Sequence, residues 1–138
     1  MRDKLSLGFV ALLVLALVGV VAGTAVAQST GQAVTFVGYY MDTYCGSSGN
    51  GADGSDVVNS PQDHTKMCLV ACKAGGFGIS LKTGDAYVYY PFDKAGSDLS
   101  AKEVLNKSKR DSGFLVSVEG VLKDGTITVR SIKEANVF

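Results

Sequence analysis

Five mainly apolar segments, separated by polar stretches, mark five strands along this chain of 138 residues. Each marked segment is rich in β-branched and aromatic side chains, which favour strands. The five segments are 33–41, 77–81, 86–90, 114–122 and 126–132. The second and third, and likewise the fourth and fifth, are joined by short turns that contain glycine, which is typical of β-hairpins. The pattern therefore predicts a mainly β protein.

Capping residues and the spacing of apolar side chains predict two helices. Residues 61–73 begin with Pro61 after the capping residue Ser60 and end before two glycines, so we expect a short helix there. Residues 97–110 have an apolar stripe and exposed charges, with Ser100 as the expected cap. The first helix follows strand 1, and the second lies between strands 3 and 4.

Five strands with a helix between the third and fourth is the element order of an OB-type barrel. The expected fold is therefore α+β and mainly β, a small five-stranded OB-like barrel with an additional cysteine-bearing helix after strand 1. Closure into a barrel would hide the strand edges that a small flat sheet leaves exposed. An open α+β sheet is the competing architecture.

The N-terminus has the pattern of a secretory signal. Arg2 and Lys4 precede an almost unbroken apolar run over 7–22, and small residues lead to an expected cleavage after Ala27. We expect residues 1–27 to be a signal peptide that exports the protein to the periplasm or the extracellular space. The alternative is an uncleaved leader that anchors the chain in the membrane, since the run approaches the roughly 20 residues that span a bilayer.

Cleavage would leave residues 28–138 as one small domain of 111 residues (138 less 27). Its segment 46–60 is dominated by glycine, serine, asparagine and aspartate, and we expect it to be a flexible polar loop. The leader holds two of the 13 basic and one of the 13 acidic residues, so the domain has a net charge of −1. Nucleic-acid binding therefore lacks its electrostatic basis.

The chemistry-bearing residues gather in one short stretch. They are the three cysteines of the chain and its only histidine: Cys45, His64, Cys68 and Cys72. The last three are four residues apart, which would place them on one side of the expected helix. Three sulfurs and one nitrogen suit Zn²⁺ or Cu⁺, and either Asp42 or Asp63 would then orient the His64 ring from behind.

These residues resemble a group of small exported bacterial proteins of unknown function. In that group a first strand ends in Gly-x-x-x-Asp-x-x-Cys, here Gly38, Asp42 and Cys45, and a histidine and cysteine pair follows. The resemblance covers most of residues 33–133. It implies a small β-barrel and a cysteine and histidine cluster, and it implies no activity.

Three interpretations of the cluster remain open. A disulfide from Cys45 to Cys68 or Cys72 would close a loop of about 24 residues or slightly more and stabilise the fold by roughly 3 kcal/mol. A metal ion would use all four side chains. A histidine one helical turn before a cysteine would instead lower the pKa of that thiol and make it redox-active.

The sequence thus predicts an exported β-barrel that serves as a binding or structural module of the cell envelope, stabilised by a cysteine-based link. The alternative is a metal-binding or thiol-redox protein that uses the cluster directly. No catalytic arrangement of nucleophile and base stands out, so the sequence favours a protein without enzymatic activity. Its ligand and partner are not indicated by the residues.

Overall fold

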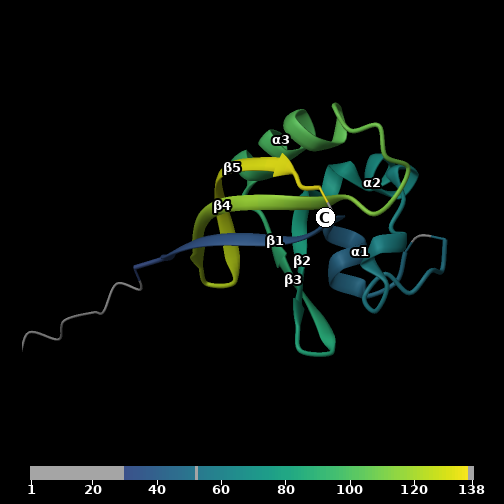
Figure 1. The fold of residues 1–138 in the computed structure, drawn as a ribbon, viewed down its shortest axis with the longest axis horizontal. Coiled ribbons are helices and arrows are strands. Elements are labelled where there is room, and N and C mark those ends of the chain that lie inside the picture. The colour runs from purple at the N-terminus through teal and green to yellow at the C-terminus, as the bar shows by residue number, and fades with distance from the viewer. Residues whose placement is uncertain (1–29, 52, 137–138) are drawn as a thin grey trace, which may run out of the picture.

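The computed structural model describes residues 30–51 and 53–136, and it contains one five-stranded sheet with short helices around it (Figure 1). The expected signal peptide, 1–27, lies outside the described residues. The strands are β1 Gln32–Asp42, β2 Phe77–Thr83, β3 Ala86–Pro91, β4 Leu115–Lys123 and β5 Thr126–Glu134. All five expected strands are therefore present, with ends shifted by at most two residues. No helix within the described residues is long and apolar enough to cross a membrane.

The sheet has the order β3-β2-β1-β4-β5, and every neighbouring pair is antiparallel. The long strand β1 lies at the centre, where it pairs with β4 along its first part and with β2 at its end, for example Asp42 opposite Phe77. Both expected hairpins are confirmed. At the β4–β5 turn Asp124 and Gly125 both have positive φ, as the tight Asp-Gly turn requires.

The fold class is confirmed as mainly β, and the helices lie in the expected order along the chain. The sheet is not closed into a barrel. The end of one edge strand, β3, meets the other, β5, through an isolated parallel bridge between Phe92 and Ile127, and the Asp93 N–H donates to the Ile127 carbonyl at 3.0 Å.

The helical segments are all short. They are α1 Thr43–Ser48, η1 Pro61–Asp63, α2 Lys66–Ala71, η2 Lys73–Gly75, α3 Lys94–Ser100 and the π-helical turn η3 Ala101–Leu105. In Figure 1, α1 and α2 both lie near the end of β1, whereas α3 lies beside β5. The end of β1 is therefore the place where the cysteine-bearing segments meet the sheet.

The prediction of one helix over 61–73 is wrong. The chain is extended at His64 (ψ 123°) and Thr65 (ψ 157°), which separates η1 from α2. The Thr65 hydroxyl accepts a hydrogen bond from the Cys68 N–H at 3.3 Å and so caps a new helix, whereas Ser60 makes no side-chain cap. As a result His64 precedes α2 and Cys72 follows it, so the expected single stripe of His64, Cys68 and Cys72 does not form.

The second expected helix, 97–110, is also displaced. Asp93 caps it, with the Gly96 N–H donating to the Asp93 carboxylate at 2.8 Å, and the helical turns end at Leu105. Ser100 is not a cap. It is buried inside the helix, where its hydroxyl donates to the Ser97 carbonyl and accepts from the Tyr40 hydroxyl of β1. This contact ties the helix to the centre of the sheet.

Two groups of buried side chains support the fold. The larger core lies between the sheet and α3, with Tyr40 stacked on Phe77 at a ring distance of 4.9 Å. The smaller one consists of Met41, Cys45 and Val57, with Tyr89 packed against it. This smaller cluster lies beside the cysteine-bearing segments.

Val57 belongs to the segment expected as a flexible polar loop, 46–60. The first three residues of that segment are in α1, and Val57 is fully buried in the cluster that contains Met41 and Cys45. One apolar side chain thus fastens an otherwise polar segment to the protein. The mobility of this loop stays a prediction.

Candidate functional site

Asp42 is the last residue of β1, and its side chain turns back to cap α1. Its Oδ1 atom accepts a hydrogen bond from the Cys45 N–H at 2.9 Å, so the carboxylate supplies a partner for the first turn of that helix. The same contact places the Cys45 side chain beside the carboxylate. Both residues are completely buried.

His64 contacts the same carboxylate from the other side. The Nε2 atom of His64 lies 2.9 Å from Oδ2 of Asp42, and only 1% of the histidine surface is exposed. The distance is that of an ion pair, but the atoms are not aligned as a hydrogen bond. The second ring nitrogen, Nδ1, has no hydrogen-bond partner among the described residues. A buried imidazole with an unused nitrogen is unusual, because burying an unpaired polar atom is costly.

Cys72 completes the group from the end of α2. One carboxylate oxygen of Asp42 and the sulfurs of Cys45 and Cys72 all lie within 4.8 Å of one another. Asp42 and Cys45 come from the junction of β1 and α1, whereas Cys72 follows a helix that begins more than 20 residues later. We call Asp42, Cys45 and Cys72 the donor group.

Cys68 is buried but lies outside the donor group. It stands one turn before Cys72, whose backbone N–H donates to the Cys68 carbonyl at 3.0 Å. No disulfide is formed among the three cysteines, all of which fall in the described part of the chain. The Cys68 sulfur is therefore buried apart from the sulfurs of Cys45 and Cys72.

The charges at the site are strongly coupled. Burial alone would raise the pKa of the Asp42 carboxyl, but the contact with His64 and the hydrogen bonds from Cys45 together hold that pKa below its ordinary value. Burial, followed by the negative charge of Asp42, raises the pKa of the Cys72 thiol. A carboxylate that stays ionised next to two thiols is a strong attractor for a cation.

The structure brings together most of the residues that the sequence singled out, but it exchanges two roles. Asp42, expected behind the histidine, is a member of the donor group, while His64 lies behind Asp42. Asp63, the other candidate for orienting His64, is exposed on η1. The short helix α1 was not predicted from the sequence. The signal for it was Asp42, because aspartate is a preferred N-cap residue and Asp42 stands directly before the first residue of this helix.

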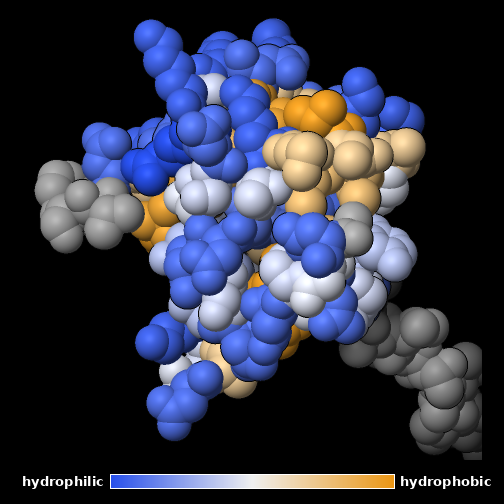
Figure 2. All heavy atoms as spheres, turned by 90° about the vertical axis from the view of Figure 1, so that its right-hand side faces the viewer, coloured by the Kyte–Doolittle hydropathy of each residue, from blue (hydrophilic) through white to orange (hydrophobic). Residues whose placement is uncertain are grey.

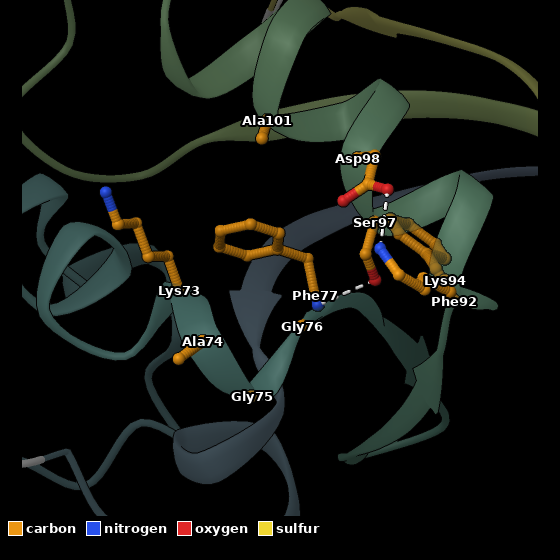
Figure 3. A pocket seen from close by; sticks show the side chains of 10 residues that line it. All are labelled: Lys73, Ala74, Gly75, Gly76, Phe77, Phe92, Lys94, Ser97, Asp98 and Ala101. Carbon is orange, nitrogen blue, oxygen red and sulfur yellow. Dashed lines mark hydrogen bonds and ion pairs between the residues drawn. The ribbon is translucent and has the colours of Figure 1, made fainter.

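A second candidate site is a cavity of about 440 Å³ between η2 and α3 (Figure 3). Its charged groups are Lys73 on one side and Lys94 with Asp98 on the other. Lys94 is already paired with Asp98 at 2.9 Å, and the Ser97 hydroxyl is engaged by the Phe77 N–H. This cavity contains none of the cysteines, so the distinctive chemistry of the chain lies elsewhere.

Two thiols and one carboxylate in a compact, largely buried group can do either of two things. They can hold a thiophilic metal ion, because thiolates and carboxylates are both ligands of Zn²⁺. The two thiols can also be oxidised to a disulfide. Comparison with known proteins does not decide between them: no protein-family model, no curated protein and no solved structure matches this chain.

Proposed function

We propose that this protein binds one Zn²⁺ ion through Asp42, Cys45 and Cys72. The observation that carries the proposal is the mutual distance of the three donor atoms, all within 4.8 Å of one another although Cys72 comes from a different segment than Asp42 and Cys45. Ligands around one tetrahedral zinc ion must gather in this way, and three protein ligands leave a fourth position for water or another small ligand.

Charge favours a divalent ion. Cys45 and Cys72 would bind as thiolates, and Asp42 as a carboxylate, so the site supplies three negative charges. Zn²⁺ cancels two of these charges, whereas Cu⁺ would cancel only one and leave a larger uncompensated negative charge, which is costly. Zn²⁺ therefore fits the donor group better than the monovalent ion does.

His64 acts as the orienting residue of this site. Its Nε2 contact with Oδ2 of Asp42 fixes the carboxylate from behind, while the Cys45 N–H fixes Oδ1. Groups that hold metal ligands in place typically contribute tenfold to a hundredfold in affinity. We therefore expect His64→Gln to weaken zinc binding without abolishing it.

Zinc titration of the reduced, metal-free protein tests the proposal. We expect one equivalent of zinc, measured by elemental analysis after gel filtration, and loss of that zinc in Cys45→Ser and Cys72→Ser. Cys68→Ser is the matched control, because it removes a buried thiol outside the donor group. Zinc retained by Cys72→Ser, or never bound by the wild type, would refute the zinc site.

A second candidate function for the same residues is a structural disulfide between Cys45 and Cys72. The observation that favours it is that both sulfurs belong to the donor group. The bond would close a loop of about 28 residues, counting both cysteines, and stabilise the protein by about 3.5 kcal/mol. Peptide mapping without reductant distinguishes the two candidates, because a Cys45–Cys72 cross-link excludes thiolate binding of zinc.

We also propose that the chain is an OB-like module exported to the cell envelope. The parallel bridge between Phe92 and Ile127 supports the architecture, because it brings together the edge strands that a closed OB barrel joins. The charged and apolar pattern of the first 27 residues supports export. N-terminal sequencing of the exported protein tests cleavage after Ala27, and full-length protein in the membrane fraction would contradict it.

A further inference from the structure

The two cysteines of the donor group differ in their access to solvent. Cys45 is completely buried in α1, whereas Cys72 is partly exposed at the end of α2. The helix α2 lies on the end of the molecule that faces the viewer in Figure 2, where most of the surface is hydrophilic. A polar reagent in solution therefore meets Cys72 before it meets Cys45.

The sulfurs of these two cysteines lie close to each other. They are within 4.8 Å of one another, and the same limit holds for an oxygen of Asp42. A disulfide holds its sulfurs about 2.0 Å apart, so a bond between them requires the two side chains to turn toward each other. Cys68 is only 4% exposed and lies outside the donor group, so it is shielded both from reagents and from this bond.

We propose that Cys45 and Cys72 form a thiol switch, in which a small disulfide compound oxidises the pair and releases the zinc ion. This inference rests on the proposed zinc site and adds its regulation. It differs from a permanent structural disulfide, because the reduced protein binds zinc and the oxidised protein does not. The proposed export would bring the chain into an oxidising compartment, where such disulfides persist.

The switch consists of two thiol–disulfide exchanges. Zinc holds both sulfurs as thiolates, which is the form that attacks a disulfide. The Cys72 thiolate leaves zinc and attacks one sulfur of the reagent, which forms a mixed disulfide and releases half of the reagent as a thiolate. The Cys45 thiolate then attacks the Cys72 sulfur, forms the Cys45–Cys72 bond and releases the other half as a thiolate. Two electrons thus pass from the protein to the reagent, and Zn²⁺ keeps its charge.

Oxidation removes two of the three proposed zinc ligands. Asp42 remains, and one carboxylate is too few for a zinc site, which needs three or four protein ligands. The contacts of Asp42 with the His64 ring and with the Cys45 N–H involve neither sulfur, so they persist after the ion has left. The buried carboxylate therefore keeps its partners in both states of the switch.

Oxidation of the zinc-loaded full chain with glutathione disulfide tests this proposal. A coloured chelator reports the released zinc, and peptide mapping identifies the cysteines that are cross-linked. Cys68→Ser is the matched control, because it removes the buried thiol outside the donor group. We expect the wild type and Cys68→Ser to release one equivalent of zinc in step with the Cys45–Cys72 cross-link. Reduction with dithiothreitol should restore zinc binding.

Two variants, both metal-free, test the order of the exchanges. In Cys45→Ser the mixed disulfide with glutathione should accumulate on Cys72, because the thiol that completes the switch is missing. In Cys72→Ser the buried Cys45 should react at least about tenfold more slowly, since reagents reach exposed thiols first. Mass spectrometry of samples taken over time measures both rates.

Three results would overturn the switch and leave the zinc site intact. They are zinc that stays bound after prolonged oxidation, zinc release without a Cys45–Cys72 cross-link, and equal reaction rates of Cys45 and Cys72 in the two variants. A wild type that binds no zinc before oxidation would overturn the site and the switch together.

Discussion

Asp42 and His64 contact each other inside the protein, with Nε2 2.9 Å from Oδ2 while 0% and 1% of the two residues are exposed. The contact joins the end of β1 to the short extended segment between η1 and α2. It fixes the carboxylate around which Cys45 and Cys72 gather. The burial of Asp42 therefore depends on His64, because an unpaired buried charge costs far more free energy than a paired one.

Removing one partner should therefore destabilise the fold. We expect His64→Ala to lower the free energy of unfolding by about 3 kcal/mol at neutral pH, since Asp42 would remain buried without its partner. Urea denaturation of the reduced, metal-free protein measures this effect.

The exposed ion pair of Lys94 and Asp98, also at 2.9 Å, is the matched control for that experiment. Lys94→Ala should leave stability nearly unchanged, because solvent screens an exposed pair. If His64→Ala lowered the free energy of unfolding no more than Lys94→Ala does, the contact between Asp42 and His64 would not stabilise the fold, and the prediction would be wrong.

Val57 should connect the polar loop to the zinc site. It is fully buried in one cluster with Met41 and Cys45, so Val57→Ala should cost about 2 kcal/mol of stability and also weaken zinc binding. The neighbouring Val58 is only partly buried, so Val58→Ala should have a smaller effect on stability and on zinc binding. Thermal unfolding and zinc titration check both variants, and identical zinc affinities would disprove the connection.

Gly38 should tolerate no side chain. A Cβ atom at this position of β1 would lie 2.4 Å from the Ser80 carbonyl oxygen, which belongs to the backbone of β2 and cannot turn away. Gly38→Ala should therefore destabilise the protein by about 3 kcal/mol. Gly75→Ala is the control, because its nearest contact would be 4.0 Å away. Equal stability of the two variants, measured by chemical denaturation, would contradict the packing described for β1.

Stability should fall at high pH because of Tyr89. Burial raises the pKa of Tyr89 to about 12, although the hydrogen bond that its hydroxyl donates to Thr43 partly offsets this. The folded protein then keeps a proton that the unfolded chain loses near pH 10. The contribution is complete below pH 10 and is lost as the pH rises through about 12.

Denaturation at a series of alkaline pH values measures this loss, and Tyr89→Phe removes the group. The variant should show a shallower decline than the wild type between pH 10 and 12. If stability declined equally steeply in both proteins, the pKa of Tyr89 would not be raised in the folded state.

The strands could be predicted from the sequence because their signals are local. A run of β-branched and aromatic residues can be recognised without knowing the partner strand, and the Asp124–Gly125 turn is specified by two adjacent residues that adopt positive φ. The pairing of β1 with β4, by contrast, joins segments some 80 residues apart. No local signal in either segment specifies this pairing.

The arrangement of the cysteine cluster was not predictable in the same way. The spacing of His64, Cys68 and Cys72 suits a continuous helix, but Thr65 offers a competing cap that starts α2 two residues after His64. That break turns His64 toward Asp42. A local competition between two helix starts thus decides which side chains form the donor group.

The zinc content of the protein as it is produced tests the central claim most directly. Native mass spectrometry of the chain, purified without reductant or chelator, reports bound metal and cysteine oxidation in one measurement. We predict one zinc ion per chain, lost in Cys72→Ser and kept in Cys68→Ser. A metal-free mass lower by two protons, with a cross-link mapped between Cys45 and Cys72, would contradict it.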